Sequence, residues 1–218
     1  MSISKVAIIR TGSANLASVQ AAFRRLEVSN RVIDSPAELN SDEAVALPGV
    51  GSFRSGIQSI DELGWKAVLR ERFEQDLPTL AICLGLQLLG EESEESPQRS
   101  GLAIMPVKVS RIPENVAVPH FGWNQVVSRG PKDAKSVLTT DYFYFANSFC
   151  VQECGQLESA GWEVATTTHG VEFVAAARKG NWLACQFHPE LSGRAGLKLL
   201  NQWIQFGDNA ARKETGLC

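Results

Sequence analysis

A single α/β domain is the fold that this sequence predicts, with a mostly parallel central sheet flanked by helices and with antiparallel strands added. Over roughly the first ninety residues, apolar strand-like runs alternate with helical patterns, whereas shorter strands follow one another over the second half. The length of 218 residues, with 44% hydrophobic and 21% charged residues, suffices for one sizeable core. No internal repeat or linker is evident, so we expect one domain over residues 1–206 and a polar C-terminal tail over residues 207–218.

The first half alternates strands with helices. The run Lys5–Ile9 is apolar and short, as a buried strand is, and Asn15–Leu26 carries apolar residues at helical spacing. The further elements expected here are strands at 31–33, 44–47 and 79–82 and helices around 57–63 and 66–73. Because parallel strands need crossover connections, repeated strand–helix–strand units predict a parallel sheet.

The second half begins with an acidic, polar stretch at 91–100, which we interpret as a solvated surface loop. After it, the expected elements are strands at 107–111, 124–127, 142–147, 164–168, 173–178 and 182–186, followed by a helix at 193–206. Strands without intervening helices are typical of antiparallel pairs, so we expect antiparallel additions to the parallel sheet.

Composition and charge exclude several classes of protein. A net charge of −3 and a pI of about 5.7 do not build the basic face that nucleic acid requires. No apolar run approaches the roughly 20 residues of a membrane span. The run Val6–Ile9 is too short for a signal peptide, so we expect a cytoplasmic protein. Three histidines without clustered ligands predict no metal site, and no cofactor is expected.

The five cysteines show no paired spacing, which indicates reduced thiols rather than disulfides. Cys185 lies in an apolar strand, where a free cysteine is usually a small hydrophobic residue. Cys150 and Cys154 fall in an expected loop or strand end, and Cys218 is the last residue. Of the five, Cys83 is the one that stands where a nucleophile is expected.

Cys83 ends an apolar strand and is followed by Leu84, Gly85 and a helical pattern. A strand–turn–helix of this kind presents a nucleophile on a tight turn at the carboxyl edge of a sheet, and Gly85 allows helix and strand to approach closely. The helix N-terminus beside the sulfur favours the thiolate. The same segment, taken alone, equally permits a buried structural cysteine.

The segment Gln186-Phe187-His188-Pro189-Glu190 follows the last expected strand. Pro189 restricts the backbone, so that His188 and Glu190 can be held rigidly in one site. A cysteine nucleophile needs a base to move its proton, and that base needs a carboxylate to orient it. Both His188 and Cys83 follow strands at a sheet edge, which favours their meeting, although a surface-turn histidine remains the alternative.

A glycine-rich turn, Pro48-Gly49-Val50-Gly51, also follows a predicted strand. Glycines allow backbone N–H groups to turn toward negative charge, which in acyl transfer is the tetrahedral oxyanion. No Lys-Ser/Thr pair follows the glycines, which disfavours a phosphate loop. An ordinary tight turn is the alternative interpretation.

Together, the three motifs resemble the class I, triad-type glutamine amidotransferases over nearly the whole chain and in the same order. Within that family, the chain most resembles the glutaminase subunit of imidazole glycerol phosphate synthase. Four stretches carry this finer resemblance: Thr11–Val19, Pro119–Asn124, Tyr142–Phe149 and His188–Gly193.

The resemblance implies a glutaminase in which Cys83 attacks the side-chain amide of glutamine, His188 protonates the departing ammonia and Glu190 completes the triad. It also implies roles for further residues: an oxyanion hole at Val50, Gly51 and Leu84, a glutamine pocket with Gln87, Ser148 and Phe149, and a partner interface with Asn15, Pro119, His120 and Trp123. The implied partner is a (βα)8-barrel cyclase, bound as a heterodimer. That partner uses the ammonia in histidine biosynthesis to form imidazole glycerol phosphate and a purine-pathway carboxamide ribonucleotide.

One departure from the family pattern concerns the stretch Tyr-Phe-x-His-Ser, where this chain has Asn147 in place of the histidine. Three alternatives to the histidine-pathway function stay open from the sequence. The same glutaminase could serve another synthase, such as one that amidates a nucleotide-linked sugar. The chain could instead be a catalytically silent regulatory subunit or a free-standing cysteine hydrolase.

Overall fold

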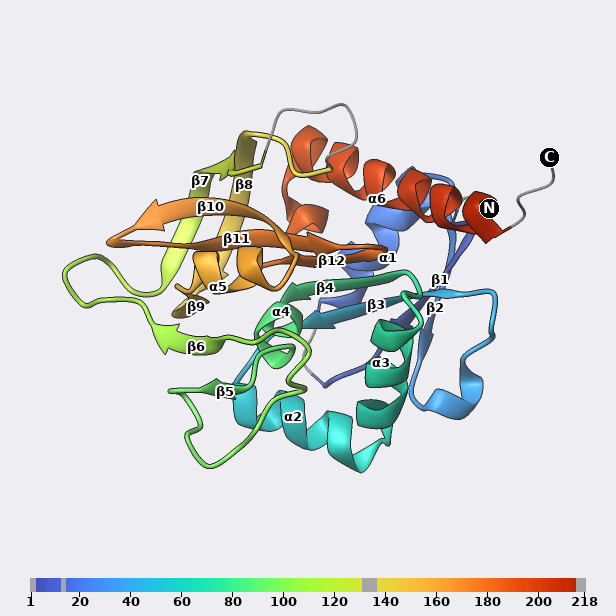
Figure 1. Cartoon of the computed structure of the whole chain (residues 1–218), viewed down its shortest axis with the longest axis horizontal. Coiled ribbons are helices and arrows are strands. Elements are labelled where there is room, and N and C mark those ends of the chain that lie inside the picture. Colours follow the sequence, from blue (N-terminus) through green and yellow to red (C-terminus); the bar gives the residue numbers. More distant parts are fainter. Residues whose placement is uncertain (1–2, 13–14, 131–136, 215–218) are drawn as a thin grey trace.

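The computed structural model describes residues 3–12, 15–130 and 137–214, and within these ranges a nine-stranded sheet forms the centre of the molecule (Figure 1). The strands lie in the order β2-β1-β3-β4-β12-β11-β10-β7-β8. In that order their bounds are Ser29–Ile33, Lys5–Ile9, Ala44–Gly49, Thr79–Cys83, Trp182–Cys185, Val171–Lys179, Glu163–His169, His120–Ser128 and Asp141–Asn147.

The sheet changes character at β12. The pairs β1–β2, β1–β3, β3–β4 and β4–β12 are parallel, whereas β12–β11, β11–β10, β10–β7 and β7–β8 are antiparallel. A second sheet of three short strands has the order β5-β6-β9, over Glu92–Ser93, Lys108–Arg111 and Phe149–Val151. The predicted fold class, a parallel sheet with antiparallel additions, is confirmed.

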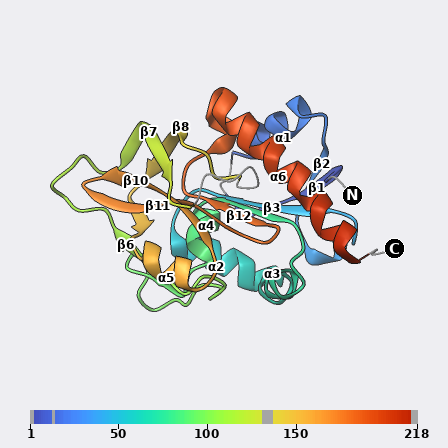
Figure 2. The same cartoon turned by 45° about the horizontal axis from the view of Figure 1, so that its top comes forward.

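Helices cover both faces of the central sheet (Figure 2). The helices are α1 (Leu16–Arg25), α2 (Phe53–Glu62), α3 (Trp65–Glu74), α4 (Leu84–Leu88), α5 (Cys154–Ser159) and α6 (Gly193–Glu214), with 3-10 turns η1 (Pro36–Glu38) and η2 (Pro189–Leu191). One core cluster joins the sheet to α1 and α6, and the other joins its opposite face to α2, α3, α4 and α5. Along β1, Val6 and Ile8 belong to the first cluster while Ala7 and Ile9 belong to the second. This alternation is the two-residue period of a strand buried on both faces.

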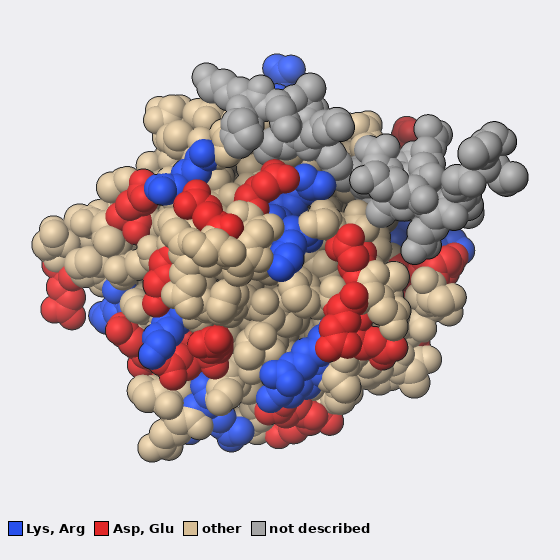
Figure 3. Space-filling view, in the orientation of Figure 1, with Lys and Arg blue, Asp and Glu red and all other residues tan. Residues whose placement is uncertain are grey.

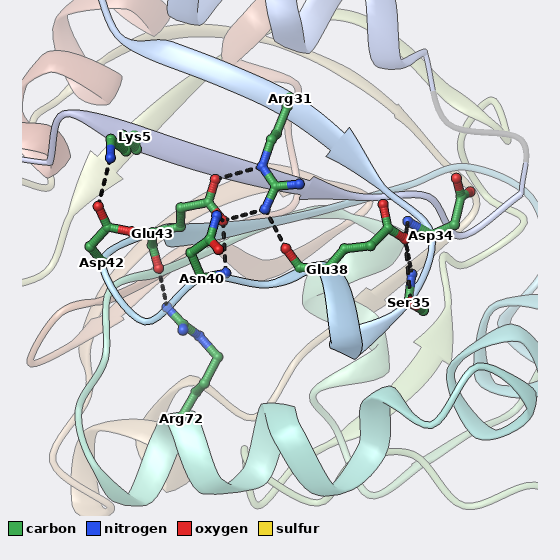
Figure 4. Close-up of polar contacts among 9 residues, drawn as sticks. All are labelled: Lys5, Arg31, Asp34, Ser35, Glu38, Asn40, Asp42, Glu43 and Arg72. Carbon is green, nitrogen blue, oxygen red and sulfur yellow. Dashed lines mark hydrogen bonds and ion pairs between the residues drawn. The ribbon is translucent and has the colours of Figure 1, made fainter.

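Polar contacts hold the amino ends of the parallel strands together (Figure 4). Lys5 at the start of β1 pairs with Asp42 at 2.7 Å, and Arg31 of β2 pairs with Glu43, just before β3, also at 2.7 Å. The buried Arg72 of α3 donates hydrogen bonds to the carbonyl oxygens of Glu43 (3.3 Å) and Pro78 (2.8 Å). These contacts stabilise the sheet near the amino ends of its parallel strands. The predicted motifs follow the opposite, carboxyl ends of the strands.

Three sequence-based expectations need correction. The segment 91–100 is not a purely solvated loop, since Ser93 and Ser96 are buried and the Glu95 carboxylate accepts a hydrogen bond from the Phe53 N–H at 2.6 Å. Cys150 lies inside β9 and Cys154 begins α5, two elements that the sequence did not predict. The last helix reaches Glu214 rather than ending at residue 206.

The surface carries charges of both signs. On the face seen in Figure 3, Lys and Arg side chains are interspersed with Asp and Glu side chains. In the part of the chain that the structure describes, no helix has the length and apolar character needed to cross a membrane. Cys218, interpreted above as a terminal thiol, lies outside the described residues.

Candidate active site

Cys83 lies at the junction of β4 and α4, where the chain makes a strained turn. Its backbone has φ 54° and ψ −108°, a conformation that costs a non-glycine residue on the order of 1–3 kcal/mol. The turn is possible because Gly85 has no side chain: a Cβ there would lie 2.0 Å from the Leu47 carbonyl oxygen of β3. The elbow predicted from the sequence is therefore present, with the cysteine side chain at the carboxyl edge of the sheet.

His188 and Glu190 follow β12, the strand that pairs with β4. The His188 Nδ1 lies 2.8 Å from Glu190 Oε1, and both side chains are buried. The backbone of His188 is itself fixed, because its N–H donates to the Tyr144 carbonyl at 2.9 Å and its carbonyl accepts from the Ser192 hydroxyl at 2.6 Å. Two neighbouring parallel strands thus bring together residues that are far apart in the sequence.

The charge state of His188 depends on its two partners. Burial alone lowers the pKa of His188, yet the hydrogen bonds to Cys83 and Glu190 outweigh burial and raise that pKa to about 10. An imidazole with a raised pKa holds its proton at neutral pH, which is what protonation of a leaving amine requires. A thiol, an imidazole and a carboxylate therefore lie in contact in that order, an arrangement that could serve as nucleophile, base and orienting group.

The glycine-rich turn packs directly on the elbow. A Cβ on Gly49 would lie 2.9 Å from the Leu84 Cβ, and Gly51 has φ 103°, which favours glycine. Val50, Gly51, Cys83 and Leu84 all line one pocket. The three residues predicted for an oxyanion hole therefore line the same pocket as the predicted nucleophile.

This pocket has a volume of about 330 Å³, in the range of small-molecule sites. Its wall contains the elbow, the glycine turn, the end of β8 and the start of β7. The lining residues are Val50, Gly51, Cys83, Leu84, Gln87, Glu95, Pro119, Phe121, Ala146, Asn147, Ser148, Phe149 and His188. Gln87, Ser148 and Phe149, predicted for the glutamine pocket, are among them, while Glu190 stands behind His188.

Gln186 is a site residue that the sequence reasoning missed. Its side chain is fully buried, its Nε2 donates to the Cys83 Sγ at 3.6 Å, and its Oε1 accepts from Gln87 Nε2 at 3.1 Å. Gln87 Nε2 also donates to the Phe149 carbonyl at 3.0 Å. The available signal was a glutamine at the end of an apolar run, two residues before His188, because a buried amide at that place needs polar partners.

Glu95 and Asn147 are also wall residues without a predicted role. Glu95 reaches the pocket from the segment after α4, and it is fixed by the Phe53 N–H. Asn147 ends β8, is 5% exposed and donates from Nδ2 to the Phe149 carbonyl at 3.0 Å. Among the described residues, no group of three or more His, Cys, Asp or Glu side chains could hold a metal ion.

The residues predicted to face a partner are not equivalent in the structure. Trp123 is 56% exposed, Pro119 follows a cis peptide bond and lines the pocket, and Asn15 is an exposed N-cap whose side chain accepts from the Ser18 N–H. His120, in contrast, is 4% exposed and cannot offer a surface, because its ring is packed between other rings. The neighbouring Phe121, which was not predicted, is 68% exposed.

Comparisons with known proteins show the family of the chain. The sequence matches the family described as glutamine amidotransferase class-I over residues 7–205. It is 40% identical over 201 residues to the imidazole glycerol phosphate synthase subunit HisH of Moorella thermoacetica, covering 91% of this chain and 93% of that protein. It is 39% identical over 200 residues to the HisH subunit of Methanothermobacter thermautotrophicus, covering 92% of this chain and 98% of that protein.

Solved structures show the same fold at lower identity. A crystal structure of a glutamine amidotransferase has a TM-score of 0.72 at 19% identity, covering 93% of this chain and 98% of the other. A crystal structure of a glutamine amidotransferase from Thermotoga maritima has a TM-score of 0.62 at 17% identity, covering 99% of this chain and 87% of the other.

The chain thus belongs to the class I glutamine amidotransferases, whose family model it matches over residues 7–205, and its fold is the one seen in the solved glutamine amidotransferase structure. Within that family, the chain belongs with HisH, the subunit of imidazole glycerol phosphate synthase.

Proposed function

We propose that this protein hydrolyses glutamine to glutamate and ammonia with Cys83, His188 and Glu190, and that it does so in the cytoplasm as one subunit of imidazole glycerol phosphate synthase. The single observation that carries the proposal is the junction of β4 and β12, where His188, in contact with Cys83, is held by Glu190 at 2.8 Å. Residues 1–206 carry this glutaminase domain.

The reaction begins with attack of the Cys83 thiolate on the side-chain amide carbon of glutamine. The carbonyl electrons move to the oxygen, and the backbone N–H groups of the Val50–Gly51 turn and of Leu84 stabilise that oxyanion. One such donor is worth on the order of 3 kcal/mol of the barrier. Collapse of the intermediate breaks the carbon–nitrogen bond, and the His188 imidazolium gives its proton to the leaving nitrogen, so that ammonia departs and a thioester remains.

The second half of the reaction regenerates the enzyme. Neutral His188 removes a proton from water, the resulting hydroxide attacks the thioester, and the carbon–sulfur bond breaks to give glutamate and the thiolate. Glu190 acts as a positioning residue, since its carboxylate holds the Nδ1–H of His188 and directs the other ring nitrogen toward the reacting atoms. Its burial behind His188 supports this role.

The amino-acid end of glutamine requires its own contacts. Glu95 places a carboxylate in the pocket wall, which suits an α-ammonium group. Gln87 uses both hydrogens of Nε2 on Phe149 and Gln186, so its amide oxygen is the atom left to accept from substrate. With Ser148 and Phe149 on the same wall, these residues would bind glutamine above Cys83.

We propose further that the partner is a (βα)8-barrel cyclase bound as a heterodimer, and that it docks on the outer face of β7 and β8. Large hydrophobic side chains are exposed there: Phe121 (68%), Trp123 (56%), Tyr142 (55%) and Val127 (46%). Such a patch is typical of a protein interface. Phe121 also lines the pocket, which supports an ammonia exit toward this face.

The decisive experiment measures glutamate release from glutamine, with and without the barrel partner loaded with its phosphorylated ribulosyl substrate. We expect weak activity alone, strong stimulation by the loaded barrel, and loss of activity in Cys83→Ser. Strong unaided turnover would indicate a free-standing hydrolase. No turnover under any condition would indicate a silent regulatory role, and turnover without stimulation would point to another synthase, such as one that amidates a nucleotide-linked sugar.

A further inference from the structure

Two buried polar atoms beside the pocket have no hydrogen-bond partner among the described residues. They are the Nδ1 of His120 and the Oδ1 of Asn147, and the two side chains are 4% and 5% exposed. A buried donor or acceptor that is left unpaired lowers the stability of the folded state, so unpaired atoms on two neighbouring residues call for a common explanation.

The two residues are direct neighbours across the β7–β8 pair, where His120 is opposite Asn147. Side chains of such a pair lie on the same face of the sheet, with their Cβ atoms about 4.5–5.5 Å apart. The His120 ring is held between the rings of Phe145 and His169, with centroid distances of 4.8 Å and 4.1 Å. Because the ring is fixed by stacking, its two nitrogens have fixed directions.

The tautomer of His120 follows from Asn124. The Oδ1 of Asn124 accepts from the Gln125 N–H at 2.8 Å and its Nδ2 donates to the Thr168 carbonyl at 2.9 Å, which fixes the orientation of the amide. The same Nδ2 lies 3.3 Å from His120 Nε2, which must therefore be the acceptor. Burial and the neighbouring His169 lower the pKa of His120 to about 4, so the ring is neutral at pH 7. Its proton is on Nδ1, and this atom is a donor.

Asn147 supplies the opposite group. Its Nδ2 donates to the Phe149 carbonyl, and this contact leaves Oδ1 as an acceptor on the other side of the amide. A donor and an acceptor, both buried and unpaired, therefore belong to two side chains that are opposite each other on adjacent strands.

We propose that His120 and Asn147 form a binding site for one small neutral molecule that accepts one hydrogen bond and donates another. The His120 Nδ1–H donates to the lone pair of the occupant, and a hydrogen of the occupant is donated to Asn147 Oδ1. Water and ammonia both have this chemistry. Water is available to the site without any reaction. Ammonia as the occupant rests on the proposed function, which would produce it.

The place of the site gives it a consequence for the pocket. Asn147 lines the pocket, and its Nδ2 shares the Phe149 carbonyl with Gln87, which contacts Gln186 and through it the sulfur of Cys83. An occupant that fixes Asn147 therefore also fixes one wall of the pocket. The amide of Asn147 places an acceptor oxygen on the residue that is opposite His120.

The site is tested by crystallography and NMR on the full chain. A high-resolution crystal structure is expected to show one ordered molecule within hydrogen-bond distance of both His120 Nδ1 and Asn147 Oδ1. In 15N-histidine-labelled protein, the His120 Nδ1–H proton is expected to give a cross-peak to bound water that disappears in Asn147→Leu. A direct hydrogen bond between the two side chains, or an empty gap, overturns the proposal even if the variant does not fold.

A titration separates the two occupants. Ammonium chloride is added at a pH where neutral ammonia is abundant, with sodium chloride at equal ionic strength as the control. A saturable shift of the His120 Nδ1 signal in the ammonium series alone identifies ammonia as a ligand. Persistence of the water cross-peak without that shift identifies water, and the absence of both signals refutes the site. None of these readouts depends on glutamine hydrolysis, so the test is independent of the proposed function.

Discussion

At Gly85 we expect the addition of a single methyl group, in Gly85→Ala, to lower both the stability and the activity of the protein. A Cβ added there would lie 2.0 Å from the Leu47 carbonyl oxygen, a separation that real Cβ atoms essentially never show. The atom in the way belongs to the backbone, so helix α4 and strand β3 must move apart by more than about 1 Å to reach a normal contact. In an unobstructed helix the same substitution stabilises by up to about 1 kcal/mol, so steric conflict and helix propensity have opposite signs here.

The steric effect should prevail. Overpacking of a rigid core costs about 1–3 kcal/mol, and the helix-propensity gain offsets up to about 1 kcal/mol of it, so Gly85→Ala is expected to destabilise the protein by about 1–2 kcal/mol net. For a domain of this size, that lowers the melting temperature by roughly 2–8 °C. Glutaminase activity should fall by about 100-fold as well, because Cys83 lies two residues away and a shift of about 1 Å disrupts its alignment with His188.

The matched control is Gly155→Ala in α5, where an added Cβ has nothing within 4 Å. That variant should be as stable as the wild type or slightly more stable, since the substitution in a helix reduces unfolded-state entropy. Urea denaturation followed by circular dichroism gives both midpoints, and glutamate release gives the activity. Equal midpoints for Gly85→Ala and the wild type would refute the steric reasoning.

Three further predictions concern the triad, pH and the partner face. In Glu190→Gln the pKa of His188, about 10 in the wild type, should fall, and kcat should drop on the order of 10²- to 10⁴-fold with little change in KM; an unchanged kcat would contradict the positioning role. His120 has a pKa of about 4, below its ordinary value near 6.5, so its contribution to stability is complete above pH 6.5 and is lost as pH falls toward 4. His120→Phe keeps an aromatic ring but removes this titration. The loss of unfolding free energy between pH 7 and pH 4.5, measured by urea denaturation, should therefore be smaller in the variant by up to about 3 kcal/mol. The same pH dependence in the variant and the wild type would contradict this role of His120. Trp123→Ala should weaken binding of the barrel partner by tenfold or more, as an exposed aromatic anchor does, and calorimetry that shows equal affinity would move the interface elsewhere.

Local sequence patterns were sufficient for the elements with strong periodicity. Lys5–Ile9 was predicted with its observed bounds, and the elbow after β4 was predicted because an apolar strand, a cysteine and a glycine follow one another. The meeting of Cys83 and His188 was also predictable, because both follow strands and the carboxyl ends of parallel strands share one edge of a sheet.

What the sequence did not reveal depends on contacts between distant segments. His120 has the neighbours of an interface residue in sequence, but its ring is buried because Phe145 and His169 pack on it from other strands. Likewise, nothing local to Glu95 shows that it reaches back to the start of α2, 42 residues earlier in the chain. β9 and α5 were missed because they are only three and six residues long, which gives a periodic pattern too little length to be detected.

The pairing of β4 with β12 has a consequence for the chain while it is being synthesised on the ribosome. The proposed nucleophile is made early, but β12, which precedes the proposed base, is the last strand among the described residues. The contact between β4 and β12 spans about a hundred residues. Such a long-range parallel contact forms late in folding, since its loop-closure entropy must be overcome first. A nascent or C-terminally truncated chain therefore has a cysteine without a partner. Under the proposed function, such a chain lacks both the base and its orienting carboxylate until synthesis has passed residue 190, so we expect unfinished copies to release no ammonia from glutamine.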